Sequence, residues 1–333
     1  MRGMRKKLIA IVLAVVVVGA AVATIAYLYA PSTLAWIALT RSPAPGRDLV
    51  GSIESGGLHR TYLLHLPPSY DDSHPVPLLL VFHGGYMTGK SMALLTGFSY
   101  TADTYGFIVA YPDGYDNHWN DGRNVTSASK AGVDDVGFVS NLIDSLSNQY
   151  RIDLTRVYAT GFSDGGMFTH RLACQLANKI AAVAAVSGTL PPETANTCNP
   201  GRAVPILMIH GTSDPLVPFN GGNVSVLFAK AGYVLSLNDT VNRWMQIDSC
   251  PTTPAVTALP EVVNDGTTVV RESYGPCMQG TSVVAYIITG GGHAWPGGPQ
   301  YDPVFIVGKA SQNLDASQVI WTFFEEYSMP QSG

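Results

Sequence analysis

The sequence contains few charged residues: Asp, Glu, Lys and Arg make up 13% of its 333 residues. It has no basic tract beyond its N-terminus, and its net charge is −5. Proteins that bind nucleic acid need a basic patch to contact the phosphates, so we expect no nucleic-acid partner. Hydrophobic residues amount to 46% and glycines number 34, which is typical of a loop-rich enzyme rather than a disordered chain.

Cysteines are also few, and their spacing argues against a metal site. The four lie at Cys174, Cys198, Cys250 and Cys277, with no Cys-x-x-Cys pair and no histidine cluster, so we expect neither zinc nor another metal. An even number in an exported chain predicts two disulfides, with three possible pairings. Sequential pairing, Cys174–Cys198 and Cys250–Cys277, closes the shortest loops and is our expectation. Four buried thiols are the alternative.

The N-terminus combines basic residues with a long apolar run. Leu8 to Ala30 carries no charge and follows Arg2, Arg5, Lys6 and Lys7. This order predicts a hydrophobic helix that enters the export machinery with its basic end inside. A run of about 23 residues is long enough to remain as a membrane anchor, whereas cleavage near Ala23 would release a secreted protein. Either outcome places the rest of the chain outside the cytoplasm.

Residues 1–30 are thus an anchor or signal peptide, and the proline-containing residues 31–47 read as a linker. We find no internal repeat and no second linker, so residues 48–333 are predicted to form one domain. Apolar runs of strand length alternate in it with segments of helical spacing. This alternation predicts an α/β fold, with a mostly parallel central sheet and helices on both faces. The expected strands are 62–66 (at an edge), 78–82, 107–111, 182–186, 205–211, 268–274 and 283–289, and the expected helices are 139–146, 236–247 and one capped by Asp315.

Residues 161–165 read Gly-x-Ser-x-Gly, between a strand-like run and a segment with helical spacing. This context is that of a nucleophile elbow, in which the serine occupies a strained turn and flanking side chains would collide with the strand and helix. The glycines remove that collision and leave the Ser163 hydroxyl exposed. The backbone N–H of Asp164 then faces the position of an oxyanion. The same five-residue pattern is also common in ordinary loops. The strand-like run before it and the helical spacing after it favour a nucleophile.

A serine nucleophile requires a base, and the base requires an acid that orients it. In α/β-hydrolases the order along the chain is serine, acid, histidine, each beyond the carboxyl end of a strand. Asp214 follows the predicted strand 205–211, and His293 lies in a glycine-rich loop after the strand 283–289. The alternatives are an Asp-Pro turn for Asp214 and a solvated loop histidine for His293. Three rival histidines precede the acid in the chain: His83, His170 and His210.

The segment His83-Gly84-Gly85-Tyr86 follows an early predicted strand, as oxyanion-hole loops do. We therefore assign the oxyanion hole to the N–H of Asp164 and one N–H from Gly85 or Tyr86. Trp119 and Trp295, with Tyr86, are candidates for an aromatic substrate pocket. Ordinary core packing is the alternative for each tryptophan.

Taken together, these motifs resemble the α/β-hydrolase esterase family of poly(3-hydroxybutyrate) depolymerase-like enzymes and feruloyl esterases. The motifs are residues 83–85, 111–114, 119–120, 133–138, 161–167, 210–214 and 293–297. The resemblance covers residues 50 to 325 and implies the α/β-hydrolase fold. It implies Ser163, Asp214 and His293 as the triad, no cofactor, and Trp295 near the acyl or alcohol pocket. The implied substrate is an ester, including polymer- or polysaccharide-linked ones.

The sequence leaves the substrate class open in one respect, because no separate polymer-binding domain is visible. A soluble ester, a polyhydroxyalkanoate-type oligomer, or an acyl or feruloyl group on a carbohydrate fits as well as solid polyester.

Gly-x-Ser-x-Gly-Gly also resembles prolyl-oligopeptidase-type serine peptidases, but these carry a propeller domain for which the chain has no room. A catalytically inactive hydrolase-fold binding module would lack a triad member, and none is missing.

N-terminal sequencing of the exported protein tests the fate of the first segment. We expect an uncleaved anchor, so the exported chain should begin upstream of Ala23 and sediment with membranes. A soluble product that begins just after Ala23 would instead identify a cleaved signal peptide.

Overall fold

The computed structural model describes residues 44–226 and 229–330, all within one unit that spans residues 42–333. The expected anchor and residues 31–43 of the linker lie outside the described residues. None of the helices in residues 44–226 and 229–330 could span a membrane. The elements in chain order are β1 (Arg47–Ser55), β2 (Leu58–Leu66), β3 (Val76–Phe82), α3 (Gly89–Thr96), α4 (Phe98–Tyr105), β4 (Ile108–Pro112), α5 (Ser127–Lys130), α6 (Asp135–Gln149), β5 (Ile152–Phe162), α7 (Asp164–Gln175), β6 (Ala182–Val186), α8 (Pro192–Thr197), β7 (Ile206–Gly211), β8 (Gly222–Val226), β9 (Ala229–Val234), α9 (Leu237–Ile247), β10 (Ala255–Ala258), β11 (Thr268–Tyr274), η1 (Met278–Gly280), β12 (Val283–Thr289), α10 (Val304–Val307) and α11 (Ala316–Glu325).

One large sheet organises the described residues, with the strand order β1-β2-β4-β3-β5-β6-β7-β12-β11-β10. The six strands from β4 to β12 in that order are parallel. Antiparallel strands flank them on both sides. Every residue of β3, β4, β6 and β7 is buried, as expected for parallel strands covered on both faces. The prediction of a mostly parallel sheet is confirmed.

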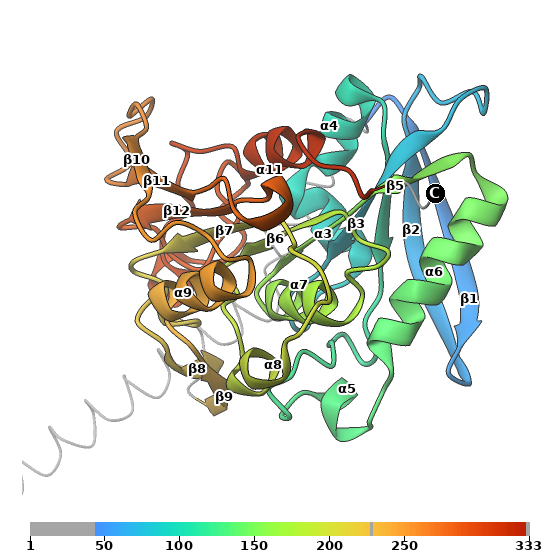
Figure 1. Ribbon diagram of the computed structural model, residues 1–333. Helices are drawn as coiled ribbons and strands as arrows, with labels where there is room; N and C mark the ends of the chain where they lie inside the picture. The colour runs from blue at the N-terminus through green and yellow to red at the C-terminus, as the bar shows by residue number, and fades with distance from the viewer. Residues whose placement is uncertain (1–43, 227–228, 331–333) are drawn as a thin grey trace, which may run out of the picture. The chain divides into compact units, whose positions relative to one another are not determined.

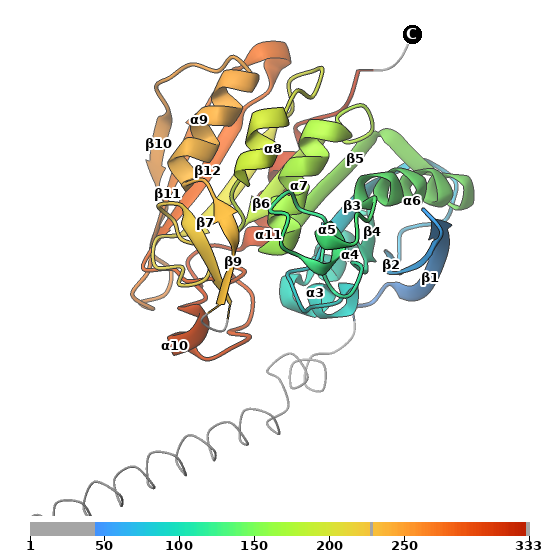
Figure 2. The same ribbon diagram turned by 90° about the horizontal axis from the view of Figure 1, so that it is seen from below.

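Helices cover both faces of this sheet. Figure 1 shows α11 and α4 side by side on one face, where they contact each other. Helices α7, α8 and α9 lie on the opposite face, and α6 continues this layer over the β1 side of the sheet (Figure 2). Several of the largest fully buried side chains, including Trp244 and Phe168, belong to the main hydrophobic core. This core therefore keeps the sheet rigid. The loops that carry the candidate site emerge from that sheet.

Most expected strands and helices are present, including the two helices whose N-terminal caps were predicted from the sequence. Ser236 caps α9 by accepting a hydrogen bond from the Asp239 N–H at 2.9 Å, and Asp315 caps α11 through the Gln318 N–H at 3.0 Å. The expected edge position of residues 62–66 is wrong, because β1 pairs with β2 and covers that edge. Strand β1 alternates between exposed and partly buried residues, so it offers no continuous apolar run.

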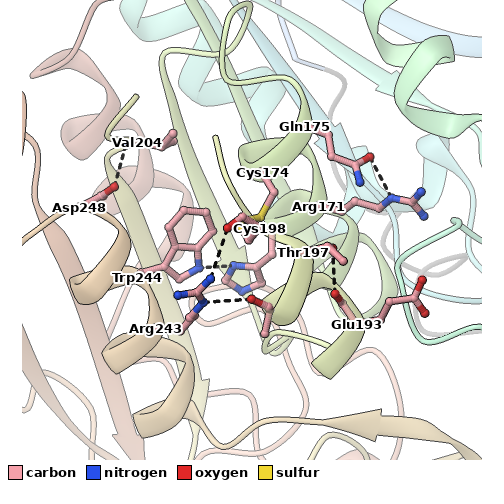
Figure 3. Close-up of a disulfide and its surroundings, with 12 residues drawn as sticks. Arg171, Cys174, Gln175, Glu193, Thr197, Cys198, Val204, Arg243, Trp244 and Asp248 are labelled. Carbon is pink, nitrogen blue, oxygen red and sulfur yellow. Dashed lines mark hydrogen bonds between the residues drawn. A yellow bond between two sulfur atoms is a disulfide. The ribbon is translucent and has the colours of Figure 1, made fainter. Parts of the chain in front are cut away.

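The structure forms both disulfides with the sequential pairing. Cys174–Cys198 connects the C-terminal turn of α7 to the end of α8, and Cys250–Cys277 connects the end of α9 to the turn after β11. Figure 3 shows the first of these beside α9, where Arg243 donates hydrogen bonds to the carbonyls of Ala195 and Cys198. The helix that begins after Ser163 is thus tied covalently to the neighbouring helix α8.

Asp248, at the C-terminal end of α9, is a buried carboxyl group with an incomplete set of partners. Its Oδ1 accepts a hydrogen bond from the Val204 N–H at 3.1 Å (Figure 3), while Oδ2 has no partner among the described residues. Burial raises the pKa of Asp248 to about 7, against the opposing effects of the Val204 N–H and Arg202. Ionisation of this group is therefore unfavourable in the folded state.

Unreduced proteolytic digests should yield two disulfide-linked peptide pairs, 174 with 198 and 250 with 277. A Cys174→Ser, Cys198→Ser double variant should lose about 3 kcal/mol of unfolding free energy, because the bridge closes a loop of 24 residues. Chemical denaturation measures this loss. Four thiols that alkylate without reduction would contradict the pairing.

Asp248→Asn should stabilise the protein at neutral and alkaline pH. Because the folded pKa lies above the unfolded value, the stability of the native protein falls as pH rises from about 4 to about 7. The variant lacks this loss, so its advantage should be absent below pH 4 and reach roughly 2–4 kcal/mol above pH 7. Thermal melts across this pH range measure the difference in stability between Asp248→Asn and the native protein. Glu261→Gln, at an exposed carboxylate, is the control. A stability difference that did not change with pH would contradict the account.

Candidate active site

Ser163 lies at the sharp turn between β5 and α7. Its φ is 56° and its ψ is −115°, a backbone conformation that residues other than glycine rarely adopt. The Ser163 N–H donates to the carbonyl of Val186 in the adjacent strand β6 at 2.9 Å, and this bond helps hold the strained turn. The geometry is that of the elbow predicted from the motif.

The two glycines of the motif are required by close backbone contacts. A Cβ on Gly161 would collide with the carbonyl of Gly165, and a Cβ on Gly165 would collide with the carbonyl of Phe82 at the end of β3. The end of β5 therefore packs against the start of α7, and the start of α7 packs against the end of β3, too closely for a side chain at either glycine. The steric explanation derived from the sequence applies in the structure.

Asp214 and His293 meet although 79 residues separate them. Asp214 follows β7 and His293 follows β12, and these two strands are parallel neighbours. His293 Nδ1 lies 2.8 Å from Asp214 Oδ2, and both side chains are almost fully buried. A hydrogen bond from the Ser213 N–H to the Gly291 carbonyl, at 2.9 Å, joins the two loops beside this pair.

The bonds around this pair fix the protonation pattern of the imidazole. A carboxylate only accepts hydrogen bonds, so Nδ1 of His293 carries the proton and Nε2 is free to accept one. The other oxygen of Asp214 accepts the N–H groups of Leu216 and Val217 at 2.9 and 2.8 Å. The carboxylate is therefore held in one orientation.

The imidazole of His293 also lies beside the elbow. Its ring centroid is 4.8 Å from that of Phe162, the residue immediately before Ser163. The His293 N–H donates to the carbonyl of Val307 at 2.6 Å, and Tyr301 Oη donates to the His293 carbonyl at 3.1 Å. In the described part of the chain, the Ser163 hydroxyl makes no hydrogen bond to His293. Such bonds often form only when substrate is bound.

The three rival histidines have structural partners. His83 Nδ1 donates to the Gly84 carbonyl and its Nε2 accepts from the Gly114 N–H, both at 2.8 Å. His210 Nε2 donates to the Val217 carbonyl at 2.9 Å, and His170 Nε2 donates to the Gly188 carbonyl at 3.1 Å. Burial lowers the pKa of all three imidazoles, and it lowers that of His170 to about 4. The three side chains therefore stay neutral.

The expected oxyanion loop lies against the elbow, with one change to the expected donors. A Cβ on Gly84 would lie 3.4 Å from the Cβ of Ser163, so the loop reaches the predicted nucleophile. The Tyr86 N–H, however, donates to the Asn117 carbonyl at 3.0 Å and is not available to substrate. Of the two candidates, the N–H of Gly85 remains, together with that of Asp164.

Neither tryptophan lines an open pocket, which corrects the pocket assignment. Trp119 is fully buried, stacks on Phe168 at 5.1 Å and donates through Nε1 to the His83 carbonyl at 3.0 Å. Trp295 is 1% exposed and donates to Ser317 Oγ at 3.0 Å. Both are large apolar groups that the core can bury because each indole N–H finds an acceptor. The packing alternative is correct for both.

The sequence did not reveal a hydrogen-bonded group of titratable residues beside the expected oxyanion loop. The Asp164 carboxylate accepts hydrogen bonds from Arg123 Nη2 at 2.9 Å and His118 Nδ1 at 3.0 Å. Arg123 also pairs with Asp121, which is fully buried. No sequence spacing links these residues, and only the position of Asp164 next to the predicted nucleophile singled it out.

A strained serine after β5 and a His–Asp pair after the nearby parallel strands β7 and β12 define an α/β-hydrolase. A solved acetyl xylan esterase from Aspergillus awamori shares the fold, with a TM-score of 0.55 and 16% identity over 74% of this chain and 94% of that one.

Sequence comparisons identify the family. The model of the phospholipase/carboxylesterase family matches residues 72–234. The chain is 32% identical over 275 residues to the "Putative esterase NocK" of Nocardia uniformis subsp. tsuyamanensis, which covers 80% of this chain and 79% of the relative. It is also 32% identical over 244 residues to feruloyl esterase B of Piromyces equi, of which it spans 42%. The chain belongs to the phospholipase/carboxylesterase family and is a serine carboxylic ester hydrolase.

Gly165→Ala should disrupt the elbow, because the added methyl group would collide with the carbonyl of Phe82. We expect a loss of about 3 kcal/mol or more in unfolding free energy and a loss of esterase activity. Gly201→Ala is the matched control: Gly201 has φ +73° but no atom near the added carbon, so only about 1 kcal/mol should be lost. Equal losses in the two variants, measured by denaturation, would contradict the packing described.

Proposed function

We propose that the protein is an exported serine esterase whose catalytic triad is Ser163, His293 and Asp214. Ser163 Oγ attacks the ester carbonyl while His293 Nε2 accepts its proton. His293 then protonates the leaving alcohol, and Asp214 keeps the imidazole in the required tautomer and stabilises its charged form. Water enters by the same route and releases the acid from the acyl-enzyme.

The negative charge that develops on the carbonyl oxygen is stabilised by two backbone donors, the N–H groups of Asp164 and Gly85. One such donor contributes about 2.7–4 kcal/mol to transition-state stabilisation in comparable sites. The start of α7 adds the positive end of its dipole at the same place. No metal or cofactor takes part in this mechanism.

The observation that carries the proposal is the buried 2.8 Å contact between His293 Nδ1 and Asp214 Oδ2. It orients the histidine beside the residue that precedes the nucleophile. The carboxylate that orients the histidine is itself fixed, because its other oxygen accepts two backbone N–H groups.

For the substrate, we propose acyl or feruloyl esters carried on carbohydrate, with hydroxyalkanoate oligomers as the second class. The names of the sequence relatives support the first class, since they include a feruloyl esterase and a bifunctional acetylxylan esterase/xylanase. Export is supported by the two disulfides, which persist in oxidising compartments, and by the basic and apolar N-terminus. The protein then acts outside the cytoplasm, anchored or secreted.

Kinetics of triad variants test the mechanism. Ser163→Ala and His293→Ala should lower kcat on p-nitrophenyl acetate by roughly 10⁴-fold or more, and Asp214→Asn by about 10⁴-fold, because the tautomer is lost. Near-normal turnover in His293→Ala would show that the base is misassigned. His74→Ala, at an exposed histidine, is the control and should keep full activity.

A substrate panel tests the assigned class. Methyl ferulate and acetylated xylan should be hydrolysed, and a peptide amide should not. Hydroxybutyrate oligomers distinguish the second class of substrate. Turnover of the amide without turnover of any ester would contradict an esterase.

A further inference from the structure

The side chain of Asp164 has a role separate from that of its backbone. Its N–H is a donor in the proposed oxyanion hole, so the following argument rests on the proposed function. The carboxylate is 2% exposed and holds the segment after β4. One oxygen accepts from Arg123 at 2.9 Å, and the other accepts from His118 Nδ1 at 3.0 Å and the Trp119 N–H at 3.3 Å. The first residue of α7 is thereby bonded to residues 118–123.

The loop that carries the second oxyanion donor rests on the same segment. A Cβ on Gly85 would lie 3.0 and 3.1 Å from Cε1 and Nδ1 of His118, so the imidazole packs directly against the Gly85 backbone. The Tyr86 N–H donates to the Asn117 carbonyl at 3.0 Å, and the Tyr86 ring meets the His118 ring edge-on at 4.5 Å. His118 therefore fills the space between the Gly85 loop and the Asp164 carboxylate.

The charges around Asp164 keep its carboxylate ionised. Although burial opposes ionisation, the hydrogen bond from His118 and the charge of Arg123 lower the pKa of Asp164 to about 2. Burial, together with the neighbouring Asp164, raises the pKa of Asp121 in spite of Arg123. Arg123 is fixed in turn by a hydrogen bond to the Ala231 carbonyl in β9, at 2.9 Å. An ionised Asp164 is a strong acceptor for both of its side-chain donors.

We propose that His118 and the Asp164 carboxylate form a positioning pair that sets the distance between the two oxyanion donors, the N–H groups of Gly85 and Asp164. The donors belong to different segments, and the His118–Asp164 hydrogen bond with the Gly85 contact is a direct link between them. An oxyanion hole acts only when its donors match the position of the developing charge. Loosening the link should therefore weaken transition-state binding and leave ground-state binding unchanged.

His118 variants test this role, because the side chain is partly exposed (15%) and can be changed with little effect on folding. His118→Ala removes both the hydrogen bond and the packing. His118→Asn keeps an N–H donor at nearly the position of Nδ1 and so restores the bond to Asp164. Steady-state kinetics on p-nitrophenyl acetate should show kcat lowered roughly 10–100-fold in the alanine variant with KM within threefold, and kcat within about fivefold of the native value in the asparagine variant.

The control is His59→Ala, which removes an exposed imidazole that bonds Glu54 at 2.8 Å, and its kinetics should be native. Melting temperatures of all variants separate a loss of folding from a loss of positioning. The proposal is overturned if His118→Ala stays within threefold of the native kcat, if its defect lies in KM, or if His118→Asn is as slow as His118→Ala. Full activity in Ser163→Ala would refute the proposed function itself, whatever the His118 variants do.

Discussion

The structure depends on one buried hydrogen bond, between the imidazole of His293 and the carboxylate of Asp214. The two residues are 79 positions apart and meet only because β7 and β12 are parallel neighbours whose carboxyl ends lie at the same edge of the sheet. Burial removes competing water, and the two N–H groups on the other oxygen keep the carboxylate from turning. The pair therefore presents Nε2 in a fixed tautomer and direction.

The sheet positions Ser163 in a different way, through the sharp turn at the end of β5. Strand β5 ends two strands away from β7, and its last residue leads into a turn that only glycine flanks allow. The strain at Ser163 is offset by the packing of α7, which a disulfide connects to α8. The Asp164 carboxylate bonds His118 and Arg123, and His118 also packs against Gly85. This group therefore connects the proposed oxyanion loop to the helix that follows Ser163.

Local signals made much of this predictable. The elbow, the caps of α9 and α11, and the buried parallel strands are encoded in short stretches, as glycine spacing, a side-chain acceptor or a continuous apolar run. Strand β1 was missed because its alternating pattern is weak, and β2 was therefore misplaced at an edge. The roles of the tryptophans and of His118 depend on contacts between distant segments. An isolated Trp119 looks the same in sequence whether it lines a pocket or stacks on Phe168.

The central claim is that His293, held by Asp214, activates Ser163. Labelling with a fluorophosphonate tests it most directly, because the probe reacts only with an activated serine and reports the modified residue by peptide mass. The account predicts a single adduct on the peptide that contains Ser163, formed at least 10³-fold more slowly in His293→Ala. An adduct on another residue, or an unchanged labelling rate in that variant, would contradict it.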